Sequence, residues 1–166
     1  MRKNGRDGMD DVEEIKKLKA RYFRSLDSKD WDTYANLFAE DCIVDLGRAG
    51  GPQYHGREEF SAYARSLKLV QSVHNGHMPE IDLTGPDTAT GVWVLEDYNL
   101  WEDGTQNHGW GHYLETYVKR GGRWYIKTMA LSYLRIDRDC PQPVLVAGKD
   151  NTAHLRGMTP AADFWR

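Results

Sequence analysis

The stretch Thr88-Ala-Thr-Gly-Val-Trp-Val-Leu-Glu-Asp-Tyr-Asn-Leu-Trp101 decides the fold of this chain. It is the second of four long β-rich runs between residues 70 and 137, which are separated by turn-forming residues near 85–87, 102–104 and 120–122. Consecutive strands joined by short turns form an antiparallel meander. Because helical patterns precede these strands, the sequence predicts an α+β fold: a cone-shaped, strongly curved, mostly antiparallel sheet with N-terminal helices closing one face.

Both faces of this second run are largely apolar. The side chains that share one face are Trp93, Leu95, Asp97, Asn99 and Trp101, and those on the other are Val92, Val94, Glu96, Tyr98 and Leu100. An antiparallel strand with one face in water should alternate apolar and polar residues instead. One face can meet the helices, so we expect the other to meet a second subunit in a homo-oligomer.

Helical periodicity begins near the N-terminus. Asp10 or Asp11 can cap a helix whose apolar residues step by three or four positions, namely Val12, Ile15, Leu18, Tyr22 and Leu26. A shorter helix (30–38), a strand (42–46), a loop (47–53) and a third helix (56–67) are expected to follow. The resulting division is a disordered N-terminus (1–9), one domain (10–137) and a C-terminal tail over the pocket or a subunit interface (138–166).

Composition narrows the class of protein. The chain has 166 residues and a net charge of −3, without a basic stripe, which argues against nucleic acid and anionic membrane as partners. No stretch approaches the roughly 18 apolar residues of a membrane span, and no apolar segment of a secretory signal follows Met1. Cys42 and Cys140 lack the spacing of a redox or metal motif. We expect a soluble cytoplasmic protein.

A histidine and an aspartate are predicted to face each other on the first hairpin of the sheet. If the two strands pair symmetrically about Gly85-Pro86, His74 lies opposite Asp97 with Cβ atoms roughly 5 Å apart. Burying a carboxylate without a partner costs several kcal/mol, so the presence of a His–Asp pair among Trp and Leu residues has to be explained. Taken alone, the pair is more typical of a hydrogen bond that only fixes the sheet.

Two further polar residues come from the first helix. Tyr22 shares its apolar face, so the hydroxyl is expected inside the domain. Asp27 lies five residues on, about 140° around the helix, where a carboxylate opposes the helix dipole. A tyrosine, a histidine and two carboxylates are the usual equipment for proton transfer. The remaining histidine spacings do not resemble a chelate, and phosphate-loop and dinucleotide motifs are missing; we expect no cofactor and no metal.

The sequence also resembles the SnoaL-like branch of the nuclear-transport-factor-2-like superfamily. The resemblance rests on the runs 21–32 (RYFRSLDSKDWD), 74–81 (HNGHMPEI), 88–97 (TATGVWVLED) and 117–126 (YVKRGGRWYI). It is closest to bile acid 7α-dehydratase, and scytalone dehydratase, ketosteroid isomerase and hexachlorocyclohexane dehydrochlorinase are relatives by fold. The similarity fades over 45–55 and after residue 137. It implies a cone-shaped fold, a trimer, and active-site positions at Tyr22, Asp27, His74 and Asp97.

Residues and resemblance together predict a cofactor-independent lyase, a dehydratase acting on a hydrophobic cyclic or aromatic hydroxylated molecule. His74 oriented by Asp27 is expected to be the acid–base, Tyr22 to stabilise an enolate, and Asp97 to assist the leaving group or position His74. Expected substrate contacts are Leu46, Trp93, Trp110 and His112. The alternatives are an isomerase, a dehydrohalogenase, a carbon–carbon lyase on lignin-type diarylpropanes, and a non-catalytic small-molecule-binding module.

Overall fold

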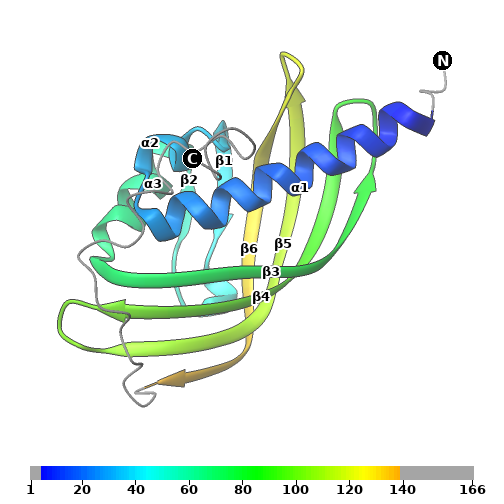
Figure 1. Ribbon diagram of the computed structural model, residues 1–166. Helices are drawn as coiled ribbons and strands as arrows, with labels where there is room; N and C mark the ends of the chain where they lie inside the picture. The colour runs from blue at the N-terminus through cyan, green and yellow to red at the C-terminus, as the bar shows by residue number, and fades with distance from the viewer. Residues whose placement is uncertain (1–4, 139–166) are drawn as a thin grey trace, which may run out of the picture.

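The structure, a computed structural model, describes residues 5–138 as helices packed on a single sheet (Figure 1). The helical elements are α1 (Gly5–Ser28), α2 (Trp31–Ala35), the 3₁₀ turn η1 (Gly47–Ala49) and α3 (Arg57–Ser66). The strands are β1 (Phe38–Asp45), β2 (Gln53–His55), β3 (Leu69–Leu83), β4 (Thr88–Trp101), β5 (Gln106–Arg120) and β6 (Arg123–Arg138).

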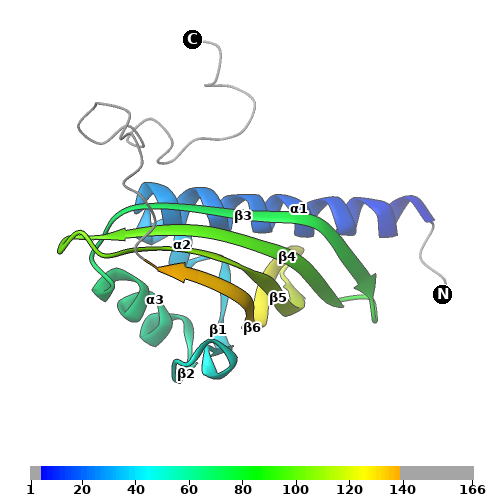
Figure 2. The ribbon, with the colours of Figure 1, turned by 90° about the horizontal axis from the view of Figure 1, so that it is seen from below.

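The six strands form one curved sheet in the order β2-β1-β6-β5-β4-β3. β1 and β6 run parallel, and every other neighbouring pair is antiparallel. The long strands β3 to β6 bend strongly along their length, and the sheet stays open (Figure 2). The α+β class and the mostly antiparallel meander predicted from the sequence are therefore confirmed.

The helices lie on one side of the bend. α1 runs alongside β3, α2 contacts both α1 and α3, and α3 packs on β1 (Figure 1, Figure 2). Aromatic rings fill the space between these helices and the sheet; Tyr34, Phe38 and Phe60 are all at most 4 % exposed. Within residues 5–138, none of the helices is long and apolar enough to cross a membrane.

The β3–β4 hairpin has the predicted register around the site. His74 pairs with Asp97, and the same register holds from Ser72 to His77. It shifts between His77 and Glu80, where Met78 has a φ of 38°. The irregularity lies beyond the histidine and leaves the pairing at His74 intact.

Several local expectations differ from the structure. The helix expected over 30–38 is shorter, α2, and the strand expected over 42–46 begins earlier, since β1 starts at Phe38. α1 begins at Gly5, so residues 5–9 are helical rather than disordered. Asp11 does not cap the start of the helix, because its carboxylate is buried and accepts hydrogen bonds from Trp124 Nε1 and Lys119 Nζ. The expected loop 47–53 contains η1 and the start of β2. With only three residues, β2 is too short to show an alternation of apolar and polar side chains. The predicted tail lies outside the described residues, apart from Arg138.

A fully buried ion pair fastens α1 to the sheet. Lys19 Nζ donates to Glu115 Oε1 at 2.5 Å, and both side chains are 0 % exposed. The ammonium also lies 3.5 Å from the ring centroid of Tyr113 and 4.0 Å from that of Tyr22. Burial lowers the pKa of Lys19 to about 8, and the attraction of Glu115 opposes that shift. The core therefore depends on keeping both members of the pair.

Removing one member of this pair should cost more than removing both. We expect Glu115→Gln to lower the free energy of unfolding by about 3–5 kcal/mol, because it leaves the Lys19 ammonium buried without its counter-charge. Adding Lys19→Met to that variant should recover part of the loss. Urea denaturation of the wild type, both single variants and the double variant measures the coupling. Additive losses would show that the two charges act independently.

Candidate active site

A cavity of about 600 Å³ lies between the concave side of the sheet and the helices. Leucine and aromatic side chains from α1, α3 and β6 form much of its wall, including Leu26, Phe60 and Leu131. Polar groups open onto the same space from β3, β4 and β5, namely His74, Asp97, Asn99 and Tyr113. Further polar residues line it near the β4–β5 turn and the end of β6, namely Asp103, Thr105, Gln106, Asn107 and Arg138. A cavity that combines an apolar wall with converging polar groups is the usual form of a small-molecule site.

His74 and Asp27 form a hydrogen-bonded dyad at one side of this cavity. His74 Nδ1 lies 2.7 Å from Asp27 Oδ1, and the backbone N–H of His74 donates to Asp27 Oδ2 at 2.9 Å. A carboxylate can only accept, so Nδ1 carries the proton and Nε2 is left as the basic nitrogen. The histidine side chain is 9 % exposed and lines the cavity. The dyad thus has the orientation of an acid–base pair.

Asp27 reaches His74 without any unwinding of the helix. It lies in the last turn of α1, whose end runs beside β3, and it faces the strand rather than the cavity. Tyr22, on the other face, lines the cavity instead. The two residues lie on different faces of the helix, as its periodicity predicts: Tyr22 lines the cavity, and Asp27 contacts His74 from the β3 side.

Asp97 is anchored from β6 across the sheet. The Tyr133 hydroxyl donates a short hydrogen bond to Asp97 Oδ2, while Oδ1 is buried without a partner among the described residues. Gly109 makes this approach possible, because an added Cβ would lie 2.5 Å from the Tyr133 ring and 2.6 Å from Asp97 Oδ1. Asp97 therefore lines the cavity with its carboxylate held in one orientation, and Oδ1 lies against the backbone of Gly109.

Three further phenols lie deep in the site. Burial raises the pKa of Tyr22 and Tyr113 well above the usual value, with the neighbouring tyrosine Tyr34 adding to the effect at Tyr22 and the Asp97 charge at Tyr113. These hydroxyls are therefore neutral hydrogen-bond donors. Tyr22 is hydrogen-bonded to Tyr34, whereas the Tyr113 hydroxyl is buried and has no partner among residues 5–138.

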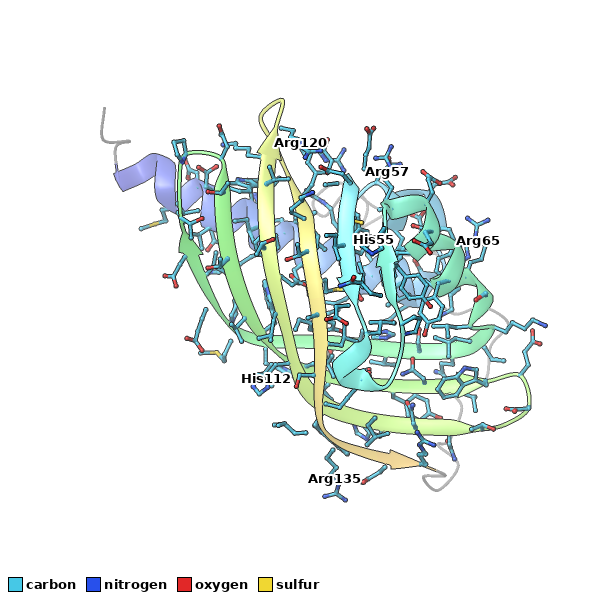
Figure 3. All side chains as sticks on the ribbon, turned by 180° about the vertical axis from the view of Figure 1, so that it is seen from behind. His55, Arg57, Arg65, His112, Arg120 and Arg135 are labelled. Atoms are coloured by element: carbon cyan, nitrogen blue, oxygen red, sulfur yellow. The ribbon has the colours of Figure 1, made fainter. Side chains whose placement is uncertain are left out.

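The structure brings together Tyr22, His74 and Asp97 at the cavity, with Asp27 behind His74. Leu46 also lines the cavity. The remaining expected substrate contacts lie elsewhere: Trp93 is buried farther along β4 and its indole donates to the Tyr117 hydroxyl, whereas Trp110 and His112 belong to the opposite face of the sheet. Figure 3 shows His112 and Arg135 on the outer side of the bend, away from α3.

Sequence reasoning missed Tyr113 and Tyr133, which come from the last two strands. Gly109 and Gly111 carried a usable signal, since glycine inside a strand often marks a close approach by another group. Ser72, which donates to Asp27 Oδ1 at 2.9 Å, carried no signal of its own.

No group of three or more His, Cys, Asp and Glu side chains within the described part of the chain is arranged to hold a metal ion. Glu96 does meet His77 at 3.3 Å and His108 at 2.9 Å, on the outer face of the sheet. Hydrogen bonds to both imidazoles, His108 first, lower the pKa of Glu96. This trio is remote from the cavity.

The helix-closed curved sheet and its enclosed polar cluster define a small α+β domain built around a ligand chamber. The chain belongs to the SnoaL-like domain family, whose sequence model matches residues 7–130. That match covers α1, the dyad, Asp97 and most of the sheet.

Named relatives share this fold at low identity. A Gibberella zeae protein named as a cyclase, FGR4, is 22 % identical over 137 residues, covering 72 % of this chain and 89 % of its own. A Novosphingobium aromaticivorans protein named for scytalone dehydratase has a TM-score of 0.73 at 20 % identity over 85 % of this chain and 97 % of its own. The hexachlorocyclohexane dehydrochlorinase LinA type 3 of Novosphingobium barchaimii has a TM-score of 0.74 at 14 % identity, over 81 % and 94 %. These structural likenesses establish the fold.

The anchoring of Asp97 can be tested through stability. Tyr133→Phe should lower the free energy of unfolding by about 1–3 kcal/mol, because a buried carboxylate oxygen loses its donor. Tyr125→Phe, on the same strand but partly exposed, serves as the control and should change it by less than about 0.5 kcal/mol. Urea denaturation compares the two. Equal losses would mean that the Tyr133 bond contributes nothing specific.

Proposed function

We propose that this protein is a cofactor-independent lyase, and specifically a dehydratase that removes water from a hydrophobic cyclic or aromatic hydroxylated molecule. The observation that carries the proposal is the His74–Asp27 dyad, with its ring at the wall of an apolar cavity and its Nδ1 fixed by a carboxylate. A binding module needs no oriented imidazole of this kind. The family membership and the enzyme names of the relatives support an enzyme.

In the proposed reaction, His74 Nε2 takes a proton from a carbon beside a substrate carbonyl. The released electron pair forms an enolate, which a neutral phenol of Tyr22 or Tyr113 stabilises by donating a hydrogen bond. Collapse of the enolate breaks the carbon–oxygen bond to the substrate hydroxyl. The imidazolium returns its proton to that oxygen, which leaves as water, while the Asp97 carboxylate accepts a hydrogen bond from the departing group.

The unpartnered polar atoms indicate what such a substrate carries. Asp97 Oδ1 and Asn99 Oδ1 are buried acceptors, and the Tyr113 hydroxyl is a buried group that can donate. A buried polar atom without a partner costs on the order of 1–3 kcal/mol, so a ligand that satisfies these atoms gains affinity. We infer a substrate with at least one hydroxyl and one carbonyl oxygen on a ring system, held by the apolar wall and by Leu46.

The same dyad could abstract a proton in an isomerase, a dehydrohalogenase or a carbon–carbon lyase, and the specific likeness to bile acid 7α-dehydratase stays a prediction. Incubation with hydroxylated steroids, polyketides and diarylpropanes, followed by mass spectrometry, distinguishes these reactions. Loss of 18 Da supports the dehydratase. Loss of hydrogen halide or a carbon fragment, or an isomer of unchanged mass, would favour the corresponding alternative.

With a converted compound in hand, His74→Ala should lower turnover by about 10²- to 10⁴-fold, the range for a positioned proton-transfer group. Asp27→Asn should lose much of the same activity, and the losses should not multiply in the double variant, because one unit is broken twice. His77→Ala, on the outer face of the same strand, is the matched control. Unchanged turnover in folded His74→Ala would contradict the mechanism and favour a ligand-binding protein.

We also propose a homo-oligomer, with a trimer favoured, that assembles through the outer face of the sheet. Val73 on the edge strand β3 and Val94 on β4 lie on that face and are 43 % and 41 % exposed, and apolar side chains exposed together on one face are typical of an interaction surface. Light scattering coupled to size exclusion should give about three times the chain mass, and Val94→Asp should reduce it. Met9→Asp, at a more exposed apolar residue on α1, should not. A wild-type mass of one chain would contradict the assembly.

A further inference from the structure

Lys29 occupies a backbone position that normally suits glycine. It follows the last residue of α1 and has a φ of 59°, in the left-handed region that side chains with a Cβ seldom adopt. Glycine would adopt this conformation without steric cost. A lysine here therefore suggests that its side chain contributes something that glycine cannot.

The Lys29 ammonium bridges the helix end and β3. Nζ donates to the backbone oxygen of Leu26 at 3.2 Å and to Ser72 Oγ at 2.7 Å. Ser72 is 4 % exposed, and its hydroxyl in turn donates to Asp27 Oδ1 at 2.9 Å. A serine hydroxyl has a single hydrogen. Lys29 donates to a lone pair of the Ser72 oxygen, so the Ser72 hydrogen remains for the Asp27 carboxylate.

A chain of hydrogen bonds thus runs from Lys29 through Ser72 and Asp27 to His74. The same Asp27 oxygen that accepts from Ser72 also lies 2.7 Å from His74 Nδ1. Fixing this oxygen fixes the ring and its tautomer, as outer partners do for histidines in metal sites.

We propose that Lys29 is a positioning residue, which acts through Ser72 to hold Asp27 in the orientation that keeps the His74 proton on Nδ1. The inference rests on the proposed function for its consequence in catalysis, but the hydrogen-bond chain can be tested without any substrate. A lysine that only capped the helix would need the Leu26 contact and not the one to Ser72.

The chain supplies a matched control. Lys68 also follows a helix, α3, has a φ of 52° and is exposed to solvent. Lys29→Gly and Lys68→Gly therefore relieve the same backbone strain, yet only the first removes a donor to Ser72. Lys29→Met keeps the aliphatic stem without the charge, and Ser72→Ala breaks the next link.

The measurement is ¹⁵N nuclear magnetic resonance of the imidazole nitrogens of His74, at a pH where the ring is neutral, beside urea denaturation of each variant. In the wild type and Lys68→Gly we expect the Nδ1–H tautomer alone. Lys29→Gly, Lys29→Met and Ser72→Ala should show a second tautomer or exchange broadening, with Lys29→Gly as stable as Lys68→Gly. Turnover should fall about tenfold in the same three variants, with KM changing less.

Two readouts separate this inference from the proposed reaction. Altered His74 signals without turnover of any compound, by the wild type included, would uphold the positioning role and count against the lyase. Wild-type His74 signals in folded Lys29→Gly and Lys29→Met would overturn the positioning role, even if the wild-type enzyme proves to be a dehydratase. Loss of stability alone, with unchanged signals, would reduce Lys29 to a helix cap.

Discussion

The carboxylate of Asp27 joins the end of α1 to the middle of β3, and the site is organised around this junction. A negative charge at a helix C-terminus opposes the helix dipole, so the position is unfavourable unless other groups compensate. Here three donors do so, from the His74 ring, the His74 backbone and the Ser72 hydroxyl. The same bonds that make this charge tolerable fix the imidazole against the cavity. The hydrogen bonds that compensate the unfavourable charge at the helix end therefore also orient the dyad.

The second carboxylate of the site, Asp97, is held by a contact that crosses the sheet. Asp97 stands directly opposite His74 on β4, but its fixed orientation comes from Tyr133, two strands away. Gly109 and Gly111 let β6 approach, since a Cβ at Gly111 would lie 2.1 Å from the Ser132 backbone oxygen. The register shift between Trp110 and Gly111 occurs at the same place. Because Gly109 and Gly111 carry no side chains, Tyr133 on β6 can reach across β5 to Asp97.

Much of this arrangement follows from alternation in the sequence, and the exceptions have identifiable causes. The pairing of His74 with Asp97 could be predicted because a hairpin with a short turn leaves few registers. Alternation also separates Trp110 from the cavity, since its partner Glu96 lies on the face opposite Asp97. How far along a strand the cavity extends is harder to predict. Trp93 shares a face with Asp97 but is buried beyond the cavity. The Tyr133 and Ser72 contacts join distant segments, which periodicity within one segment cannot reveal.

The dyad and one wall of the cavity come from different parts of the chain. The dyad and Asp97 lie in segments that resemble the family closely, whereas Ala49, Gly50 and Gly51 line the cavity from the stretch where the resemblance fades. Gly50 has a φ of 83° and Gly51 packs against Leu46, so this wall is shaped by backbone conformation more than by side-chain chemistry. A change in the η1 segment can therefore alter the shape of the cavity without moving His74 or Asp27.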